Sequence, residues 1–270
     1  MTPRTDPTGC AAIHQVAQQL ADAARAAILP YFRQAGLAAE NKHKDGFDPV
    51  TEADRAAERA MRAILTEQRP DDAILGEEYG ARAGSSGLTW VLDPIDGTRA
   101  FISGTPTWGV LIAVSDDDGP FYGMIDQPYT AERFVGFERH ARMTGPLGDR
   151  DLGTRNTARL ADAVLFTTFP GVGTGAERAA FEAVSQRTKL TRYGMDCYAY
   201  ALLASGQIDL VIEAGLQAYD IQAPIALIQA AGGVVTNWEG GPAHGGGRAL
   251  AAANPEIHGA ALEVLRESLG

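Results

Sequence analysis

Segments typical of strands and helices alternate along the second half of the chain, from Val164 to Leu269. Short runs rich in β-forming residues (VLFTTF, KLTRY, DLVIE, GVVT) are separated by runs with helical character (AERAAFEAVSQR, CYAYALLAS, IQAPIALIQAA), and PEIHGAALEVLRESL ends the series. Because strands and helices must bury their apolar faces against each other, this alternation predicts helices packed on a sheet. The pattern alone indicates an α/β or α+β fold.

The first half of the chain has a different pattern. Residues 11–32 carry an apolar stripe at helical spacing, and residues 51–68 form a second helical stretch behind a polar loop at 41–49. Between residues 90 and 137, short runs of β-forming residues separated by turns predict an antiparallel sheet. A polar, glycine-rich stretch then separates the two patterns. We therefore expect an N-terminal half at 1–143, with helices and antiparallel sheet, and a C-terminal α/β half at 144–270.

Composition and charge exclude several classes of protein. The chain has 34 acidic and 23 basic residues, and its formal net charge of −11 would repel nucleic acids and anionic membranes. Cys10 and Cys197 are the only cysteines, so neither a disulfide framework nor a thiolate zinc site is indicated. No stretch has the apolar length of a membrane helix or the pattern of a signal peptide. We expect a cytoplasmic protein with no nucleic-acid or membrane partner.

The segment WVLDPIDGT leads from an apolar strand directly into two carboxylates, a proline, a glycine and a hydroxyl. The proline bends the chain, so Asp93 and Asp96 can turn toward one point, where they repel each other unless a cation lies between them. Gly97 allows close backbone approach, and the N–H groups of Gly97 and Thr98 at a helix start would point at an anion. Taken alone, the segment could equally be a turn that caps a helix.

Carboxylates mark three further places in the chain. Glu77 follows the apolar run AIL in the motif GEE, Asp54 ends the motif DPVTEAD, and Asp220 follows a tyrosine at the start of a helical stretch. Each of them alone is best explained as a helix cap or a surface acid. An acidic protein, however, needs a bound cation to reverse the local field before it can accept a phosphate ester. Together the four acidic motifs point to a shared metal and phosphate site.

In this order, the motifs DPVTEAD, GEE, WVLDPIDGT and a late YD before AGG resemble the inositol monophosphatase superfamily of magnesium-dependent, lithium-sensitive phosphatases. The resemblance covers the chain from about Lys42 to its end. It implies a layered αβαβα sandwich of the inositol monophosphatase and fructose-1,6-bisphosphatase type, a site between the two halves, and a homodimer. The segments WVLDPIDGTRAFISG and RYGMDCYAYALLASGQIDL look most like the histidinol-phosphatase branch.

The resemblance also implies metal ligands. One Mg²⁺ would be held by Glu77, Asp93 and the backbone carbonyl of Ile95, and a second by Asp93, Asp96 and Asp220. The shared Asp93 would bridge two ions about 4 Å apart. The family pattern leaves room for a third, weaker ion near Glu77. An all-oxygen set of ligands suits magnesium.

Catalytic roles are carried over in the same way. Asp54 and Thr98 match the family's pair that orients the attacking water and helps to deprotonate it. Outside this context, Asp54 would be taken as a residue that pairs within its own helix, and Thr98 as a helix cap.

The substrate contacts are less fully specified by the motifs. Gly97 and Thr98 would contact the phosphate, and Glu213 matches a family residue that contacts the leaving group. Asp196 is a second candidate for the leaving group, with surface solvation as its alternative. Arg99 is a third candidate, with three alternatives open: a phosphate contact, a structural ion pair, or neither.

The sequence thus predicts a phosphatase that converts L-histidinol phosphate to L-histidinol in histidine biosynthesis. Acidic side chains beside the metals would complement the ammonium and imidazole of histidinol. An inositol-1-monophosphatase or a broad sugar-phosphate phosphatase is the main alternative, because Tyr219 stands where many relatives carry tryptophan and the shape of the pocket stays open. Hydrolysis of adenosine bisphosphate is less favoured, because the sequence shows no basic cluster near these motifs for a second phosphate. A catalytically silent metal-binding protein would not need both Asp54 and Thr98.

Overall fold

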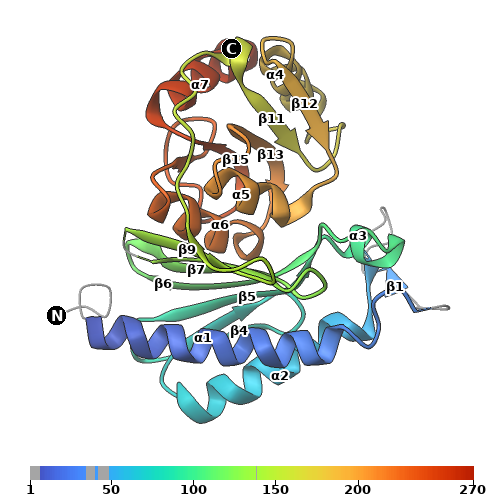
Figure 1. The fold of residues 1–270 in the computed structure, drawn as a ribbon, viewed down its shortest axis with the longest axis vertical. Coiled ribbons are helices and arrows are strands. Elements are labelled where there is room, and N and C mark those ends of the chain that lie inside the picture. Colours follow the sequence, from blue (N-terminus) through green and yellow to red (C-terminus); the bar gives the residue numbers. More distant parts are fainter. Residues whose placement is uncertain (1–6, 35–39, 42–48, 138) are drawn as a thin grey trace.

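A computed structural model describes residues 7–34, 40–41, 49–137 and 139–270. Two β-sheets alternate with three layers of helices, as Figure 1 shows from α1 and α2 at the bottom to α4 and α7 at the top. This arrangement confirms the predicted αβαβα sandwich. The polar loop expected at 41–49 lies mostly outside the described residues.

The N-terminal half forms the larger sheet, with strand order β10-β9-β8-β7-β6-β5-β3-β4. Neighbouring strands are antiparallel except β3 and β5, which are parallel. The helices are α1 (Pro7–Ile28), α2 (Glu52–Gln68) and α3 (Thr98–Ser103), and the strands are β3 (Ala73–Gly76), β4 (Gly80–Arg82), β5 (Thr89–Asp96), β6 (Gly109–Asp116), β7 (Gly119–Gln127), β8 (Glu132–Phe137), β9 (His140–Thr144) and β10 (Arg150–Asp151). A separate antiparallel pair joins β1 (Glu40–Asn41) to β2 (Pro49–Val50).

The C-terminal half forms a five-stranded sheet with the order β12-β11-β13-β15-β14. The strand β11 is parallel to β12 and β13, whereas β15 is antiparallel to both of its neighbours. The elements are η2 (Leu160–Asp162), β11 (Val164–Thr167), α4 (Gly175–Ser185), β12 (Leu190–Tyr193), α5 (Asp196–Ala204), β13 (Leu210–Leu216), α6 (Ala218–Ala230), β14 (Val234–Thr236), β15 (Gly247–Ala252) and α7 (Pro255–Leu269).

The first sheet extends past the boundary that the sequence pattern suggests between residues 143 and 144. That boundary falls inside β9, and the larger sheet continues through β10 to Asp151. The polar stretch therefore still pairs with the first sheet, because Arg150 and Asp151 lie opposite Met143 and Arg142 on β9. The second sheet begins with β11.

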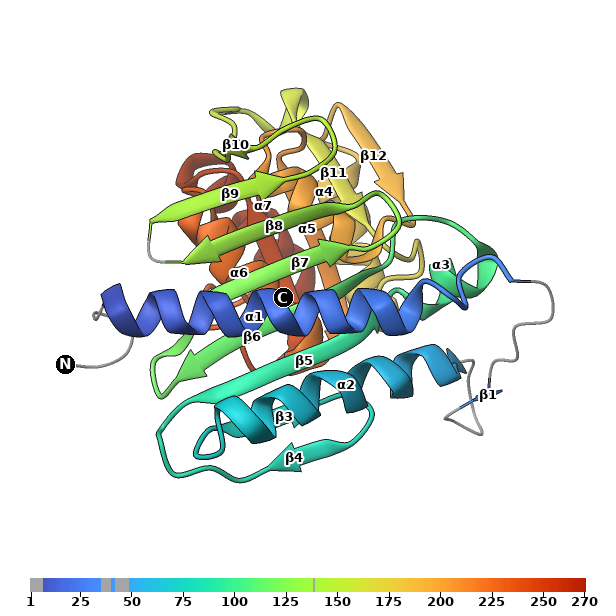
Figure 2. The same cartoon turned by 60° about the horizontal axis from the view of Figure 1, so that its bottom comes forward.

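Helices α1 and α2 pack side by side across the outer face of the larger sheet (Figure 2). The apolar stripe of α1 faces inward, since Ile13, Leu20 and Ile28 have no more than 1% of their surface exposed. The helix ends at Ile28, four residues earlier than the stripe suggests. Pro30 explains the difference, because proline cannot donate to the preceding turn and disfavours helical geometry in the residue before it.

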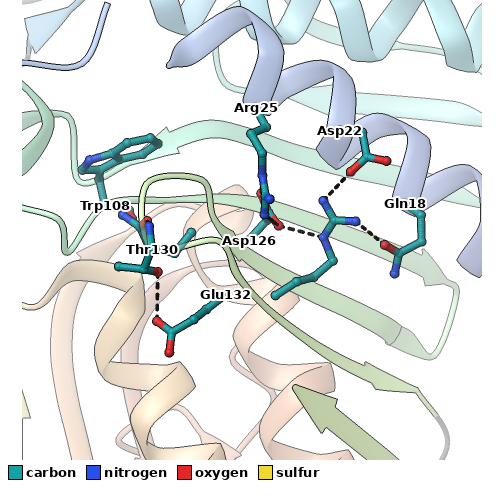
Figure 3. Close-up of polar contacts among 9 residues, drawn as sticks. Gln18, Asp22, Arg25, Trp108, Asp126, Thr130 and Glu132 are labelled. Carbon is teal, nitrogen blue, oxygen red and sulfur yellow. Dashed lines mark hydrogen bonds and ion pairs between the residues drawn. The ribbon is translucent and has the colours of Figure 1, made fainter. Parts of the chain in front are cut away.

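Charged side chains fix α1 to the sheet beneath it (Figure 3). Asp126 on β7 is fully buried and pairs with Arg25 of α1 at 2.8 Å and with Arg133 of β8 at 2.7 Å. Arg133 reaches back to α1, where it pairs with Asp22 at 2.7 Å and donates to Gln18. The carboxylate of Asp126 is thus held by two guanidinium groups, as a buried charge requires.

Two glycines let the middle layer of helices lie directly on the larger sheet. A Cβ added to Gly123 on β7 would stand 2.2 Å from the carbonyl oxygen of Ala223, and one on Gly136 of β8 would stand 2.5 Å from the Cα of Leu227. Both contacts are with the backbone of α6, so only glycine fits. The described helices include none with the length and apolar character needed to cross a membrane.

Candidate functional site

The strand β5 carries Asp93 and Asp96, and an interruption in its pairing with β6 decides where they point. Asp93 lies opposite Leu111 and Asp96 opposite Gly109, so two residues on β5 face one residue on β6. In a regular strand, residues three apart point to opposite faces of the sheet. The extra residue of this β-bulge brings both carboxylates to the same side. The motif DPID therefore forms a corner, with the proline where a missing N–H is tolerated.

The turn after β5 is fixed by Gly97 and Thr98. Gly97 precedes α3 with φ of +84°, and a Cβ there would lie 2.7 Å from Cγ of Asp196, so both backbone conformation and space require glycine. The Thr98 hydroxyl donates to the carbonyl oxygen of Ile95 at 3.1 Å and, over a longer 3.5 Å, to Oδ1 of Asp54. One hydroxyl thus links the corner of β5 to helix α2.

Asp220 reaches the same corner from the C-terminal half. It is the third residue of α6, and its carboxylate also accepts a hydrogen bond from the Gln217 N–H at 2.7 Å, which caps the helix. Carboxylate oxygens of Asp93, Asp96 and Asp220 all lie within 4.8 Å of one another, the one such trio found among the described residues. This spacing is short enough for one cation to contact all three.

The electrostatics of the trio favour a cation. Burial raises the pKa of Asp93 well above its usual value, and the charges of Glu77, Asp96 and Asp220 raise it further. Burial likewise raises the pKa of Asp96, with Asp220 the next cause. Like charges gathered in a buried place repel unless they are neutralised. A hard divalent ion fits these all-oxygen donors better than any other common metal.

Glu77 reaches the trio along a neighbouring strand. Gly76, the last residue of β3, pairs in parallel with Leu92, so the next residue on each strand, Glu77 and Asp93, arrives at the same edge of the sheet. The Glu77 N–H donates to the carbonyl oxygen of Leu92 at 3.2 Å, and its side chain contacts that of Asp93. Glu77 lies outside the trio itself but beside it.

The turn that carries Glu77 is held from behind by Glu58 of α2, whose carboxylate is fully buried. It accepts the N–H groups of Glu78 at 2.7 Å and Tyr79 at 3.2 Å, and it pairs with Arg62 at 2.6 Å. A Cβ on Gly76 would lie 2.0 Å from Oε1 of Glu58. Sequence reasoning missed Glu58, because a glutamate in mid-helix usually indicates a solvated face.

Asp54 is fully buried at the start of α2. Its carboxylate accepts hydrogen bonds from the backbone N–H of Thr51 at 2.8 Å and from the Thr51 hydroxyl at 2.6 Å. Burial raises the pKa of Asp54 to about 6, and the nearby charge of Glu77 adds to this, whereas the Thr51 hydrogen bonds oppose it. A bound cation would lower that pKa. The residue is both a helix cap and a neighbour of Thr98.

The candidate leaving-group residues lie on the C-terminal half. Glu213 on β13 is 7% exposed and accepts hydrogen bonds from the Thr168 N–H at 2.9 Å and the Tyr200 hydroxyl at 2.8 Å. Asp196 opens α5 with φ of +45° and accepts from the Thr107 hydroxyl at 2.9 Å. Burial raises the pKa of both acids. The charge of the exposed Arg99 acts against the rise at Asp196.

These residues surround one cavity of about 510 Å³ between the two halves of the chain. Every predicted metal and substrate residue lines this cavity, namely Glu77, Asp93, Ile95, Asp96, Gly97, Thr98, Arg99, Asp196, Glu213 and Asp220. Asp54 is not a lining residue, but its carboxylate contacts the hydroxyl of Thr98, which is one. The cavity wall also contains residues that no motif singled out, among them Thr167, Thr168, Phe169 and Gln217. None of these has an acidic group or a recognisable spacing that could have indicated it.

Comparison with known proteins gives a consistent result. The model of the inositol monophosphatase family matches residues 11–269. The chain is 44% identical over 228 residues to the bifunctional phosphatase IMPL2 of Arabidopsis thaliana, an alignment that spans 83% of this chain but 64% of the plant protein, just under two thirds of it. It is 33% identical to a histidinol-phosphatase of Streptomyces coelicolor, covering 94% of this chain and 96% of that protein. An inositol monophosphatase structure from Zymomonas mobilis superposes with a TM-score of 0.83 at 38% identity, covering 93% and 96% of the two chains.

Proposed function

The chain belongs to the inositol monophosphatase family, a family of phosphatases, and we propose that it is a Mg²⁺-dependent histidinol-phosphatase. The observation that carries the metal dependence is the trio of Asp93, Asp96 and Asp220, whose oxygens converge within 4.8 Å inside a cavity of about 510 Å³. Glu77 and the carbonyl of Ile95 would complete the ligands of two ions, with a third, weaker ion near Glu77. The proposal includes inhibition by lithium and a cytoplasmic homodimer, as the family resemblance implies.

Each part of the site would have a distinct task in hydrolysis. Mg²⁺, when bound, supplies positive charge that makes water more acidic and stabilises the leaving oxygen. Thr98 would orient the attacking water through its hydroxyl and pass a proton toward Oδ1 of Asp54, which lies 3.5 Å away. Gly97 and Thr98 would hold the phosphate at the start of α3. Asp54 is fully buried and its Oδ1 is the carboxylate oxygen that the Thr98 hydroxyl contacts, which places it to receive that proton.

Histidinol phosphate is proposed as the substrate because two acids beyond the metal trio, Glu213 and Asp196, line the cavity. Glu213 and Asp196 would face the ammonium and imidazole of histidinol, and Arg99 lies at the phosphate end of α3. Neutral inositol offers only hydroxyl groups, which need no carboxylate partners of this kind. Similarity to histidinol-phosphatases over nearly the full chain supports the same choice.

An inositol or sugar-phosphate phosphatase is the second candidate, supported by the similarity to the Zymomonas mobilis structure. Phosphate release from histidinol phosphate and from inositol 1-phosphate, at matched concentrations with Mg²⁺ and with and without lithium, tests the two. We expect a large preference for histidinol phosphate. A preference for the inositol ester would replace the proposed substrate, and no turnover of any ester at saturating Mg²⁺ would indicate a silent metal-binding protein.

A further inference from the structure

One large apolar side chain is left exposed in the wall of the cavity. Phe169 is 58% exposed, and of the six large apolar side chains exposed in the described part of the chain it is the one that lines this cavity. Covering an exposed phenylalanine with a ligand lowers the free energy of the complex, because apolar surface is removed from water. The other five residues, Tyr79, Tyr129, Leu147, Leu190 and Tyr193, lie elsewhere on the surface.

The backbone around Phe169 is well tied down. Its preceding residue, Thr168, donates its N–H to Oε1 of Glu213 at 2.9 Å, and the carbonyl of Thr168 accepts the Gly194 N–H at 3.0 Å. A Cβ at Gly171 would lie 2.7 Å from Cε1 of Phe169, so the absence of a side chain there lets the ring rest beside the Gly171 backbone. The ring therefore rests against the Gly171 backbone while the residue as a whole stays 58% exposed.

The exposed ring of Phe169 and the buried carboxylate of Glu213 belong to the same cavity. Glu213 is the buried carboxylate to which the chain next to Phe169 is bonded, and both residues line the cavity. Val172, Ala214 and Leu216 also line the cavity and add apolar groups to it. A ligand that fits here needs a positive charge for the acid and a flat apolar face for the ring. A polyol would instead lose water from its hydroxyls against a phenyl face that offers no hydrogen bond.

We propose that Phe169 is a specificity-determining residue, whose ring stacks on the flat ring of the leaving group. The inference rests on the proposed phosphatase function and narrows its substrate to cationic, ring-bearing phosphate esters. Phe169 takes no part in phosphate transfer, because it carries no group that could hold a proton or a metal. Its effect is confined to binding of the alcohol portion.

The test compares Phe169→Ala and Phe169→Tyr with the wild-type enzyme, using Tyr193→Ala as a matched control. Tyr193 is a similarly exposed aromatic residue, 45% exposed on β12, that does not line the cavity. For Phe169→Ala we expect kcat/KM for histidinol phosphate to fall roughly three- to tenfold, the range of one lost aromatic contact, mainly through KM. Phe169→Tyr should retain most of the activity, and Tyr193→Ala should behave as the wild type. Inositol 1-phosphate hydrolysis should change less than twofold in all variants.

Two non-biological esters separate this inference from the proposed substrate. Phenyl phosphate has a flat ring, and glycerol 2-phosphate has none. Even if histidinol phosphate proves a poor substrate, which would refute the proposed function, Phe169→Ala should still raise KM for phenyl phosphate more than for glycerol 2-phosphate. An equal change for ring-bearing and ringless esters in the folded variant, or no change for either, would overturn the role of Phe169.

Discussion

Removing one carboxylate of the trio should raise the stability of the metal-free protein and reduce the additional stability that Mg²⁺ gives. We take Asp220→Asn as the test, because the asparagine side chain can still accept the Gln217 N–H that caps α6. In the wild-type protein without metal, Asp220 faces Asp93 and Asp96 with oxygens within 4.8 Å. The substitution removes one of three mutually repelling charges and leaves the shape of the site nearly unchanged.

The distance sets the size of the effect. Two unit charges 4.8 Å apart repel by about 3.5 kcal/mol at an effective dielectric constant of about 20. The raised pKa of Asp93 and of Asp96 means that protonation already relieves part of this repulsion. The helix also loses an acidic residue from its first turn, which costs about 0.3–1 kcal/mol. We therefore expect a net gain of about 1 kcal/mol for Asp220→Asn, or a rise in Tm of roughly 2–4 °C.

Thermal unfolding with and without Mg²⁺ measures both parts of this prediction. At a concentration of one hundred times Kd, Mg²⁺ should stabilise the wild-type protein by about 2.7 kcal/mol. The Asp220→Asn protein should lose most of that gain. Asp196→Asn is the matched control, because Asp196 lines the same cavity outside the trio and its variant should keep the Mg²⁺ response. A metal-free Asp220→Asn protein that melts lower than the wild type and still responds fully to Mg²⁺ would refute the cation site.

Three further changes test separate parts of the molecule. Thr98→Ala should lower kcat by about a hundredfold or more while Mg²⁺ binding in calorimetry stays within about twofold, and equal losses of both would contradict the division of labour. Glu58→Gln replaces one of the two oxygens that accept the N–H groups of Glu78 and Tyr79 with an amide donor, so we expect Mg²⁺ affinity to weaken about tenfold. An unchanged Kd in calorimetry would contradict a role for Glu58 in positioning Glu77. Asp126→Ala leaves two guanidinium groups without their buried partner, and should lower the free energy of unfolding by about 3–5 kcal/mol in urea titrations without altering KM. A loss below about 1 kcal/mol would mean that the network in Figure 3 contributes little.

The sequence was informative where structure depends on neighbours along the chain. Helix α7 begins and ends where its pattern predicts, since Asn254 caps it and Pro255 fills its first position. The acidic motifs each end a strand or begin a helix as expected, because those positions follow from local apolar runs and turn residues. Local signals of this kind located the candidate ligands before any contact between the halves was known.

Long-range contacts explain what the sequence could not predict. The segment that forms β15 is rich in alanine, which favours helices, yet Leu250, Ala251 and Ala252 are fully buried between β13 and β14. Tertiary pairing there overrides local preference. Phe169 and Glu58 carry no motif, and their places are set by elements far away in the chain. Residues of this kind need coordinates before a role can be considered.

The strands β5 and β13, which both end at the cavity, share one feature: each has a β-bulge near its last residues. On β5 the pairing slips between Asp93 and Asp96, and on β13 it slips between Glu213 and Leu216, where Gly215 has φ of +86°. In both cases a bulge adds one residue to the strand at the edge of the cavity, which breaks the alternation of side chains that the rest of the strand obeys. The period of two residues therefore predicts the strand correctly and the direction of its last side chains incorrectly. On β5 the bulge brings Asp96 to the side of Asp93, whereas on β13 the bulge follows Glu213, which keeps its regular register with Ala249. The irregular end of β5 therefore gathers the carboxylates that we propose hold the metal.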